Sequence, residues 1–270
     1  MRQAAVAGQF YSSRPEALRK QIEACFLSPL GPGSLPEKGS AERSIVGAVV
    51  PHAGLQYSGP VAAHVYSALA KEKAPRTFII IGPNHRGLGA GVAVATDDFQ
   101  TPLGVMRLDR EIAAKISGVA EADSEAHAHE HSIEVQMPFL QYLFPEAMVV
   151  PVAMGFQDHE TAKELALEIT KATKGKDVVL LASSDMSHYI SAAKAKVLDG
   201  KVIEKILALD AKGVEEVIRQ HDISACGYGP LMTMLMSCGG TRAELLRYAT
   251  SGDVAPMDDV VGYAGVVVRK

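Results

Sequence analysis

Residues 44–59 read SIVGAVVPHAGLQYSG, and this stretch indicates the fold class. The nearly continuous apolar run at 44–50 is typical of a strand that is buried on both faces of a sheet. The next residues turn the chain, and a helical stripe then follows at Val61, Val65 and Leu69. A buried strand followed by a helix is the first half of a βαβ unit.

The same alternation continues along the chain. Further apolar runs that predict buried strands are TFIII (77–81), MVVPVA (148–153) and DVVLLAS (177–183). A helical period through Leu165 and Ile169 separates the last two runs. The sequence therefore predicts a single α/β domain over residues 1–270, with a mixed, largely parallel central sheet flanked by helices.

Two segments depart from the parallel pattern. Within residues 91–108, the runs GVAVA and VMRL on either side of a turn at TDD predict an antiparallel hairpin inserted beside the main sheet. Near the end of the chain, AELLRYAT (243–250) and VGYAGVVVR (261–269) are expected to pair antiparallel with each other.

The first forty residues predict one helix and one loop. Ser13 and Glu16 fit a capping box for a helix that carries Leu18 and Phe26 on its apolar stripe. Residues 27–43 are rich in Pro, Gly and Ser and lack a hydrophobic period, so we expect a loop there.

The composition excludes several classes of protein. The 270 residues carry 27 Lys and Arg against 31 Asp and Glu, a formal net charge of −4, which argues against a nucleic-acid partner. No apolar run reaches the roughly 18 residues that would span a membrane, and the first residues have no apolar signal core. We therefore expect a cytoplasmic protein. Three widely spaced cysteines also argue against a disulfide framework.

Histidines follow the predicted strands. His52 comes just after the run 44–50, His85 just after 77–81, and Asp185 and His188 just after 177–183. Parallel strands of an open α/β sheet deliver their carboxyl ends to one edge, where ligands bind. We therefore expect these three imidazoles and one carboxylate to converge on a shared site.

A second polar cluster lies in HAHEHSIEVQMPFLQYLF (127–144). The alternating histidines 127, 129 and 131 can supply metal ligands, but a solvated polar loop shows the same pattern. Glu130 and His131 are expected at the start of a helix with an apolar stripe. We expect both, together with Asn84, to contact the substrate or to support the ligands from behind.

The segment SACGYGPLMTMLMSCGG (224–240) places Cys226 in a glycine-rich loop just before a predicted helix that Pro230 opens. A helix N-terminus favours the thiolate, the form that binds metal or attacks carbon. Cys25 and Cys238 lie on apolar helix stripes and are expected in the core.

The motifs PHAGLQYSG, GPNHRG, HEHSIEVQMPFLQY, SSDMSHY and ACGYGP occur in the order found in the Memo family, and the resemblance extends from GQFY near the start to YAGVVVR at the end. The family resembles the catalytic subunit of class III extradiol ring-cleaving dioxygenases, which use non-haem Fe(II). The resemblance implies that His52, His85 and Cys226 are metal ligands. It further implies that His188 is an acid/base residue, with Asp185 beside it.

One departure limits what the resemblance implies. The dioxygenases complete their triad with a carboxylate, whereas this sequence offers Cys226, and a thiolate favours softer metals such as Cu(I) and changes the redox behaviour of iron. The implied cofactor is therefore Fe(II) or copper, and dioxygenase activity is not implied. By family association, an AMMECR1-domain protein and a radical-SAM protein are the expected partners, besides an unknown small molecule or peptide.

Three functions are compatible with these residues. The first is a mononuclear metal oxidoreductase in which His188, held by Asp185, moves protons. The second is a binding module that uses the same crevice for a peptide or small anion without turnover. The third is a metal-free hydrolase with Cys226 as the nucleophile and His188 as the base.

Overall fold

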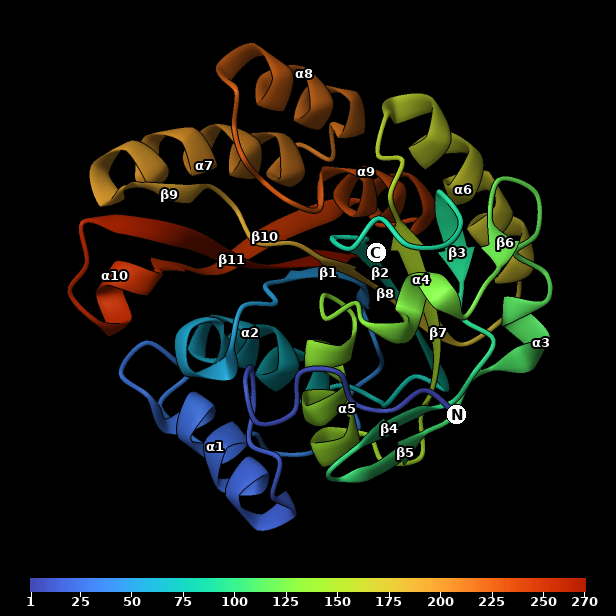
Figure 1. Ribbon diagram of the computed structural model, residues 1–270, viewed down its shortest axis with the longest axis horizontal. Helices are drawn as coiled ribbons and strands as arrows, with labels where there is room; N and C mark the ends of the chain where they lie inside the picture. Colours follow the sequence, from blue (N-terminus) through green and yellow to red (C-terminus); the bar gives the residue numbers. More distant parts are fainter.

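A nine-stranded mixed sheet crosses the centre of the computed structural model, which describes residues 1–270, and helices cover both of its faces (Figure 1). Four parallel strands form the middle of the sheet, in the spatial order β1 (Ile45–Val50), β8 (Val178–Ser183), β2 (Thr77–Pro83) and β7 (Met148–Met154). Nearly all of their residues are buried, as the continuous apolar runs predict.

Antiparallel strands extend the sheet on both sides. Next to β1 lies β11 (Asp259–Arg269), which also pairs with β10 (Arg242–Thr250) and β9 (His188–Ser191). Next to β7 lies β3 (Val92–Val94), and β6 (Glu121–Ala122) pairs in parallel with the far side of β3. The expected pairing of the two C-terminal runs is thus confirmed, as is the mixed sheet with a parallel centre.

The longer helices divide between the two faces of the sheet (Figure 1). One face carries α1 (Pro15–Leu27), α2 (Leu55–Ala70) and α5 (Met137–Leu143), and the other carries α6 (His159–Ala172), α7 (Ala192–Leu207), α8 (Ala211–His221) and α9 (Tyr228–Ser237). The short helices are α3 (Arg110–Ala113), α4 (Glu125–Ala128), α10 (Ser251–Val254) and the 3₁₀ turn η1 (Glu134–Gln136). No helix of this chain has the length and apolar composition that a bilayer-spanning segment needs.

The predicted hairpin at 91–108 is wrong in its boundaries. Val92–Val94 forms β3 of the main sheet, antiparallel to β7, because this fully buried stretch completes the sheet beside β7. The hairpin lies further along, where β4 (Phe99–Thr101) pairs with β5 (Gly104–Met106) in a separate two-stranded sheet.

Two predicted helix starts are also wrong. The first helix begins at Pro15 with Arg14 as its N-cap and no side-chain capping bond, so the Ser13 capping box does not form. Proline is suited to the first turn of a helix because it has no N–H to leave unpaired. For the same reason α5 starts at Met137, next to Pro138, and Glu130 precedes the helix by seven residues.

The central strand β2 generates a stability prediction. Ile79 is fully buried between β8 and β7, so Ile79→Ala removes apolar contacts that the packed sheet cannot restore. We expect a loss of about 2–5 kcal/mol in the free energy of unfolding by urea denaturation. Val105→Ala, at a side chain that is 42% exposed on β5, is the control and should change this energy by less than about 0.5 kcal/mol. A small effect of Ile79→Ala would contradict the described core.

Candidate metal centre

Three strand ends and one loop build a single site. His52 lies two residues beyond β1, His85 two beyond β2 and Asp185 two beyond β8, while Cys226 lies just before α9. The ligand atoms of His52, His85 and Cys226 all lie within 4.8 Å of one another. The structure therefore brings the three predicted metal ligands together at the carboxyl edge of the parallel strands, as the strand-end argument requires.

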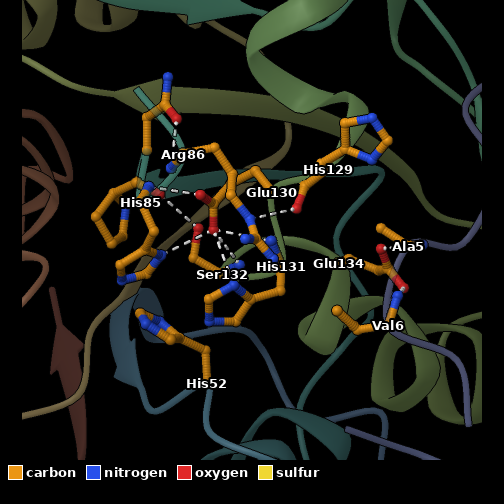
Figure 2. Close-up of polar contacts among 12 residues, drawn as sticks. Ala5, Val6, His52, His85, Arg86, His129, Glu130, His131, Ser132 and Glu134 are labelled. Atoms are coloured by element: carbon orange, nitrogen blue, oxygen red, sulfur yellow. Dashed lines mark hydrogen bonds and ion pairs between the residues drawn. The ribbon is translucent and has the colours of Figure 1, made fainter. Parts of the chain in front are cut away.

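A cavity of about 360 Å³ opens at this site. Five of the residues in its walls were predicted from the sequence, namely His52, His85, His131, Asp185 and His188. Two aromatic residues that were not predicted, Phe10 and Tyr189, also line it. No lysine or arginine lines it. The imidazoles lie close together, with ring centroids 5.3 Å apart for His52 and His85 and 4.6 Å apart for His85 and His131 (Figure 2).

Ser183 fixes the tautomer of His52. The Ser183 hydroxyl donates to the carbonyl of Ser132 (2.7 Å), and Nδ1 of His52 lies 2.9 Å from the same hydroxyl oxygen. Because the hydroxyl proton is already used, Nδ1 must donate, which leaves the Nε2 lone pair of His52 unprotonated. That Nε2 lies 3.2 Å from Sγ of Cys226. Burial, with the charges of His85 and His131, holds the pKa of His52 well below its ordinary value.

Glu130 fixes the tautomer of His85. Its Oε1 accepts a hydrogen bond from Nδ1 of His85 (2.9 Å), and its Oε2 accepts the backbone N–H of the same residue (2.5 Å). Oε1 also accepts the backbone N–H groups of His131 and Ser132, both at 2.8 Å, so that four bonds converge on one carboxylate (Figure 2). Nδ1 of His85 therefore carries the proton, and its Nε2 is free to bind a metal.

The charge of Glu130 is secured by these bonds. Burial by itself raises the pKa of Glu130, but the hydrogen bond and charge of His85 and the amide of Ser132 outweigh it and hold the pKa below the ordinary range. His85, Glu130 and His131 form a second group of potential ligand atoms within 4.8 Å. Since the Glu130 oxygens already accept four hydrogen bonds, this group is better described as support for His85.

Cys226 differs from its predicted state. Burial, and the nearby charge of Asp185, raise the pKa of the Cys226 thiol, so the expectation of a thiolate in the metal-free chain is wrong. The helix α9 begins two residues later, but its N-terminus does not compensate for the lost hydration. The backbone N–H of Asp185 does point at Sγ, at 3.3 Å, and would stabilise a thiolate once a cation is bound.

The predicted support of His188 by Asp185 is wrong. Nδ1 of His188 donates to the backbone carbonyl of Ser224 (2.8 Å), which leaves its Nε2 without a protein partner. Asp185 instead accepts the backbone N–H of His52 through Oδ1 (2.7 Å) and so positions a ligand loop. Burial raises the pKa of Asp185 to about 6. The prediction failed because Ser224 lies 36 residues further along the chain, and no local sequence pattern indicates that its loop packs against His188.

The remaining predicted residues have other surroundings. The Asn84 side chain stays within its own loop, because Nδ2 donates to the carbonyl of Leu88 (2.8 Å) and Oδ1 accepts the Gly87 N–H (3.0 Å). His127 is buried with Nε2 3.1 Å from the carbonyl of Ala93, and His129 ends α4. Neither of these two histidines lines the cavity.

The other two cysteines lie outside the site. Cys25 is buried on α1, as expected, with its Sγ 3.5 Å from the carbonyl of Leu55. Cys238 is the C-cap of α9 and packs, partly buried, against the main core.

Four residues at the site were not predicted from the sequence: Ser183, Gln136, Phe10 and Tyr189. Ser183 is the last residue of β8, and Gln136 donates to its hydroxyl oxygen from Nε2 at 2.9 Å. Gln136 is buried although it is polar. An amide within the apolar stripe of this segment could have indicated a buried hydrogen-bonding residue. Tyr189 has a left-handed backbone (φ 55°), an uncommon state for an aromatic residue that only the coordinates reveal.

The chain is an α/β protein in which the ends of two parallel strands and one loop bring two imidazoles and a thiol within 4.8 Å of one another, beside a cavity that the two imidazoles line. A family model described as "Memo-like protein" matches residues 2–267, and the chain belongs to the Memo family. The MEMO1 family protein of Methanopyrus kandleri is 47% identical over 100% of this chain and 99% of its own length. That of Methanosarcina barkeri is 46% identical over 100% of both chains, and that of Sulfurisphaera tokodaii 46% identical over 97% of each.

Among solved structures, the chain resembles an uncharacterized protein from Escherichia coli K12. The TM-score is 0.52 with 12% sequence identity, and the match covers 83% of this chain and 99% of the other. At this identity the likeness concerns the fold alone. The relation to extradiol dioxygenases stays a prediction.

The raised pKa of Cys226 predicts slow alkylation. In metal-free protein at pH 7 we expect iodoacetamide to label Cys226 no faster than Cys25, whose thiol pKa burial raises to about 12. The labelling rate of Cys226 should increase with pH as the thiolate fraction grows. Mass-spectrometric mapping of time courses at pH 7 and pH 9 measures both rates. Rapid and pH-independent labelling of Cys226 would show that the sulfur is already ionised.

The buried His127 predicts a pH-dependent stability. Burial lowers its pKa from 6.5 to about 4, so between these values the unfolded chain binds a proton that the folded chain does not. The contribution of the neutral, buried His127 to the free energy of unfolding is therefore complete above pH 6.5, and it is lost as the pH falls toward 4. Between pH 7 and pH 5 this loss is about 2 kcal/mol. Urea denaturation of wild type and His127→Gln at both pH values should show a smaller decrease for the variant, and equal decreases would contradict the assignment.

Proposed function

We propose that this Memo-family protein holds one redox-active metal ion, iron or copper, through His52, His85 and Cys226. The observation that carries the proposal is the state of the ring nitrogens. Ser183 and Glu130 engage Nδ1 of the two histidines, which leaves both Nε2 lone pairs free, and one ligand atom from each histidine lies within 4.8 Å of Sγ. Imidazoles that are oriented from behind by a hydroxyl and a carboxylate are typical of metal ligands.

The donor set fits a transition metal better than a hard cation. Two imidazole nitrogens and one thiolate suit copper, iron or zinc, whereas Mg²⁺ and Ca²⁺ prefer oxygen ligands. A set of two histidines and one cysteine is also the donor set of copper electron-transfer sites. A bound iron or copper ion would supply one-electron redox chemistry at the wall of the cavity.

The residues of the chain supply the proton chemistry. His188 lines the cavity with a free Nε2, and we propose that this atom accepts a proton from the substrate and returns it. The Ser224 carbonyl keeps the ring in this tautomer. Asp185 fixes the His52 loop, and Phe10 and Tyr189 provide apolar surface around the reacting group.

The two alternative functions receive less support. A binding module for small anions is favoured by fixed cations, and the cavity has no lysine or arginine in its wall. A hydrolase with His188 as base needs that imidazole beside Cys226, but the sulfur has His52 as its imidazole neighbour, at 3.2 Å, and Nδ1 of His188 is bound to Ser224.

Single replacements test the ligand set. We expect His52→Ala, His85→Ala and Cys226→Ser each to lower the metal content of anaerobically purified protein at least tenfold, because each removes one ligand. His188→Ala should retain the metal because its ring is not part of the close group. Elemental analysis measures both outcomes and identifies the ion.

The outcomes separate the proposal from its rivals. Zinc alone in wild-type protein would contradict a redox role, and loss of metal in His188→Ala would make this residue a ligand. Unchanged metal content in Cys226→Ser would remove the sulfur from the site. His159→Ala is the matched control, because this partly exposed histidine lies at the start of α6 and outside the site.

A further inference from the structure

Two polar segments of the chain have no direct contact with the candidate metal ligands. One is GQFY (residues 8–11), and the other is Glu134 within HEHSIEVQ. In the structure they meet. The hydroxyl of Tyr11 donates to Oε1 of Glu134, and the backbone N–H groups of Ala5 and Val6 donate to the same carboxylate at 2.9 and 3.2 Å.

Arg2 completes this buried network. Its Nη1 donates to Glu134 in a buried ion pair, its Nε donates to the carbonyl of His127 (2.9 Å), and its Nη2 donates to the carbonyl of Glu130 (2.6 Å). The guanidinium thus bridges both ends of the turn that carries Glu130. Backbone bonds to Asp98 and Gln100, on the β4 side, fix the position of Arg2 itself.

The same N-terminal segment also forms part of the cavity wall. The Phe10 ring packs on His131, with centroids 4.6 Å apart, and the Phe10 carbonyl accepts the N–H of Leu55 (2.8 Å) at the start of α2. Residues 2–11 therefore contact the two loops on which His52 and the Glu130 turn lie. Figure 2 shows Ala5 and Val6 of this segment against Glu134, beside the histidine cluster.

We propose that Arg2 and Glu134 are positioning residues of the metal site. This inference rests on the proposed function. The buried ion pair of Arg2 and Glu134 fixes the turn that carries Glu130, and Glu130 then binds Nδ1 of His85 so that its Nε2 faces the metal. Arginine is needed because its planar fork serves three acceptors at once, whereas a lysine ammonium cannot span them. A buried ion pair that only stabilised the fold would have little advantage over apolar side chains of equal volume.

Arg2→Lys tests this role, because it keeps a positive charge beside Glu134 and removes the fork. The matched control is Arg269→Lys, at a partly buried arginine whose Nη1 donates to Ser44 (2.6 Å) and Glu72 (2.7 Å). Arg269 pairs with Ile45 at the first residue of β1, the edge of the sheet opposite the site. The probes are the dissociation constant of Co²⁺ with its sulfur-to-cobalt absorption, and hydrogen exchange of residues 130–134.

We expect Arg2→Lys to weaken Co²⁺ binding about 10- to 100-fold and to speed exchange of the His131 and Ser132 amides, whose acceptor is Glu130. Arg269→Lys should change neither, even where it lowers the melting temperature as much. Unchanged Co²⁺ affinity in Arg2→Lys, or equal effects in both variants, would overturn the positioning role.

A milder variant guards against misfolding. Tyr11→Phe removes one hydrogen bond to Glu134, and Tyr142→Phe, whose hydroxyl donates to Glu23 (3.1 Å), is its control. Tyr11→Phe alone should weaken Co²⁺ binding, by about two- to fivefold, and the lack of any difference between the two would overturn the role. If wild-type protein binds no Co²⁺, the proposed function fails. The exchange comparison then decides separately whether Arg2 holds the turn, and unchanged exchange would overturn that as well.

Discussion

The buried carboxylate of Glu130 is the constraint on which the site depends. It accepts four hydrogen bonds, two from His85 and two from the backbone of His131 and Ser132. A buried carboxylate is tolerated only when its oxygens are paired, so the loop after β2 and the turn before η1 must meet in one arrangement. The orientation of His85, and with it one arm of the candidate metal site, follows from that arrangement.

Two further polar side chains extend this constraint from the same segment. Glu134 accepts bonds from the N-terminal residues, and Gln136 donates to the Ser183 hydroxyl that orients His52. All three are buried, although the segment lies between apolar residues that pack into the core. Residues 130–136 therefore connect three parts of the site: Glu130 binds His85, Glu134 binds the N-terminal segment, and Gln136 binds Ser183. Their burial is affordable only because every one of them finds partners.

The protonation states of the histidines and of Cys226 leave the site without a positive charge of its own at the ligand atoms, as binding of a cation requires. Nδ1 is the protonated nitrogen of His52, His85 and His188, because in each ring Nδ1 faces a hydrogen-bond acceptor. The acceptor is the Ser183 hydroxyl oxygen for His52, the Glu130 carboxylate for His85 and the Ser224 carbonyl for His188. The Cys226 sulfur keeps its proton in the absence of metal because burial disfavours the thiolate. Under the proposed function, metal binding would displace that proton, so that metal affinity would depend on pH through this sulfur.

Local sequence patterns were enough to predict the parallel centre of the sheet and the convergence of His52, His85 and Asp185. Both follow from local information, since continuous apolar runs mark buried strands and parallel strands end at one edge. The start of α1, the boundaries of the 99–106 hairpin, the partner of His188 and the protonation of Cys226 required the tertiary structure. Each depends on groups far away in the chain, such as the Ser224 carbonyl for His188 or the protein that removes water from Cys226. Hydrogen-bond partners and desolvation are set by packing, and no periodicity within a segment encodes them.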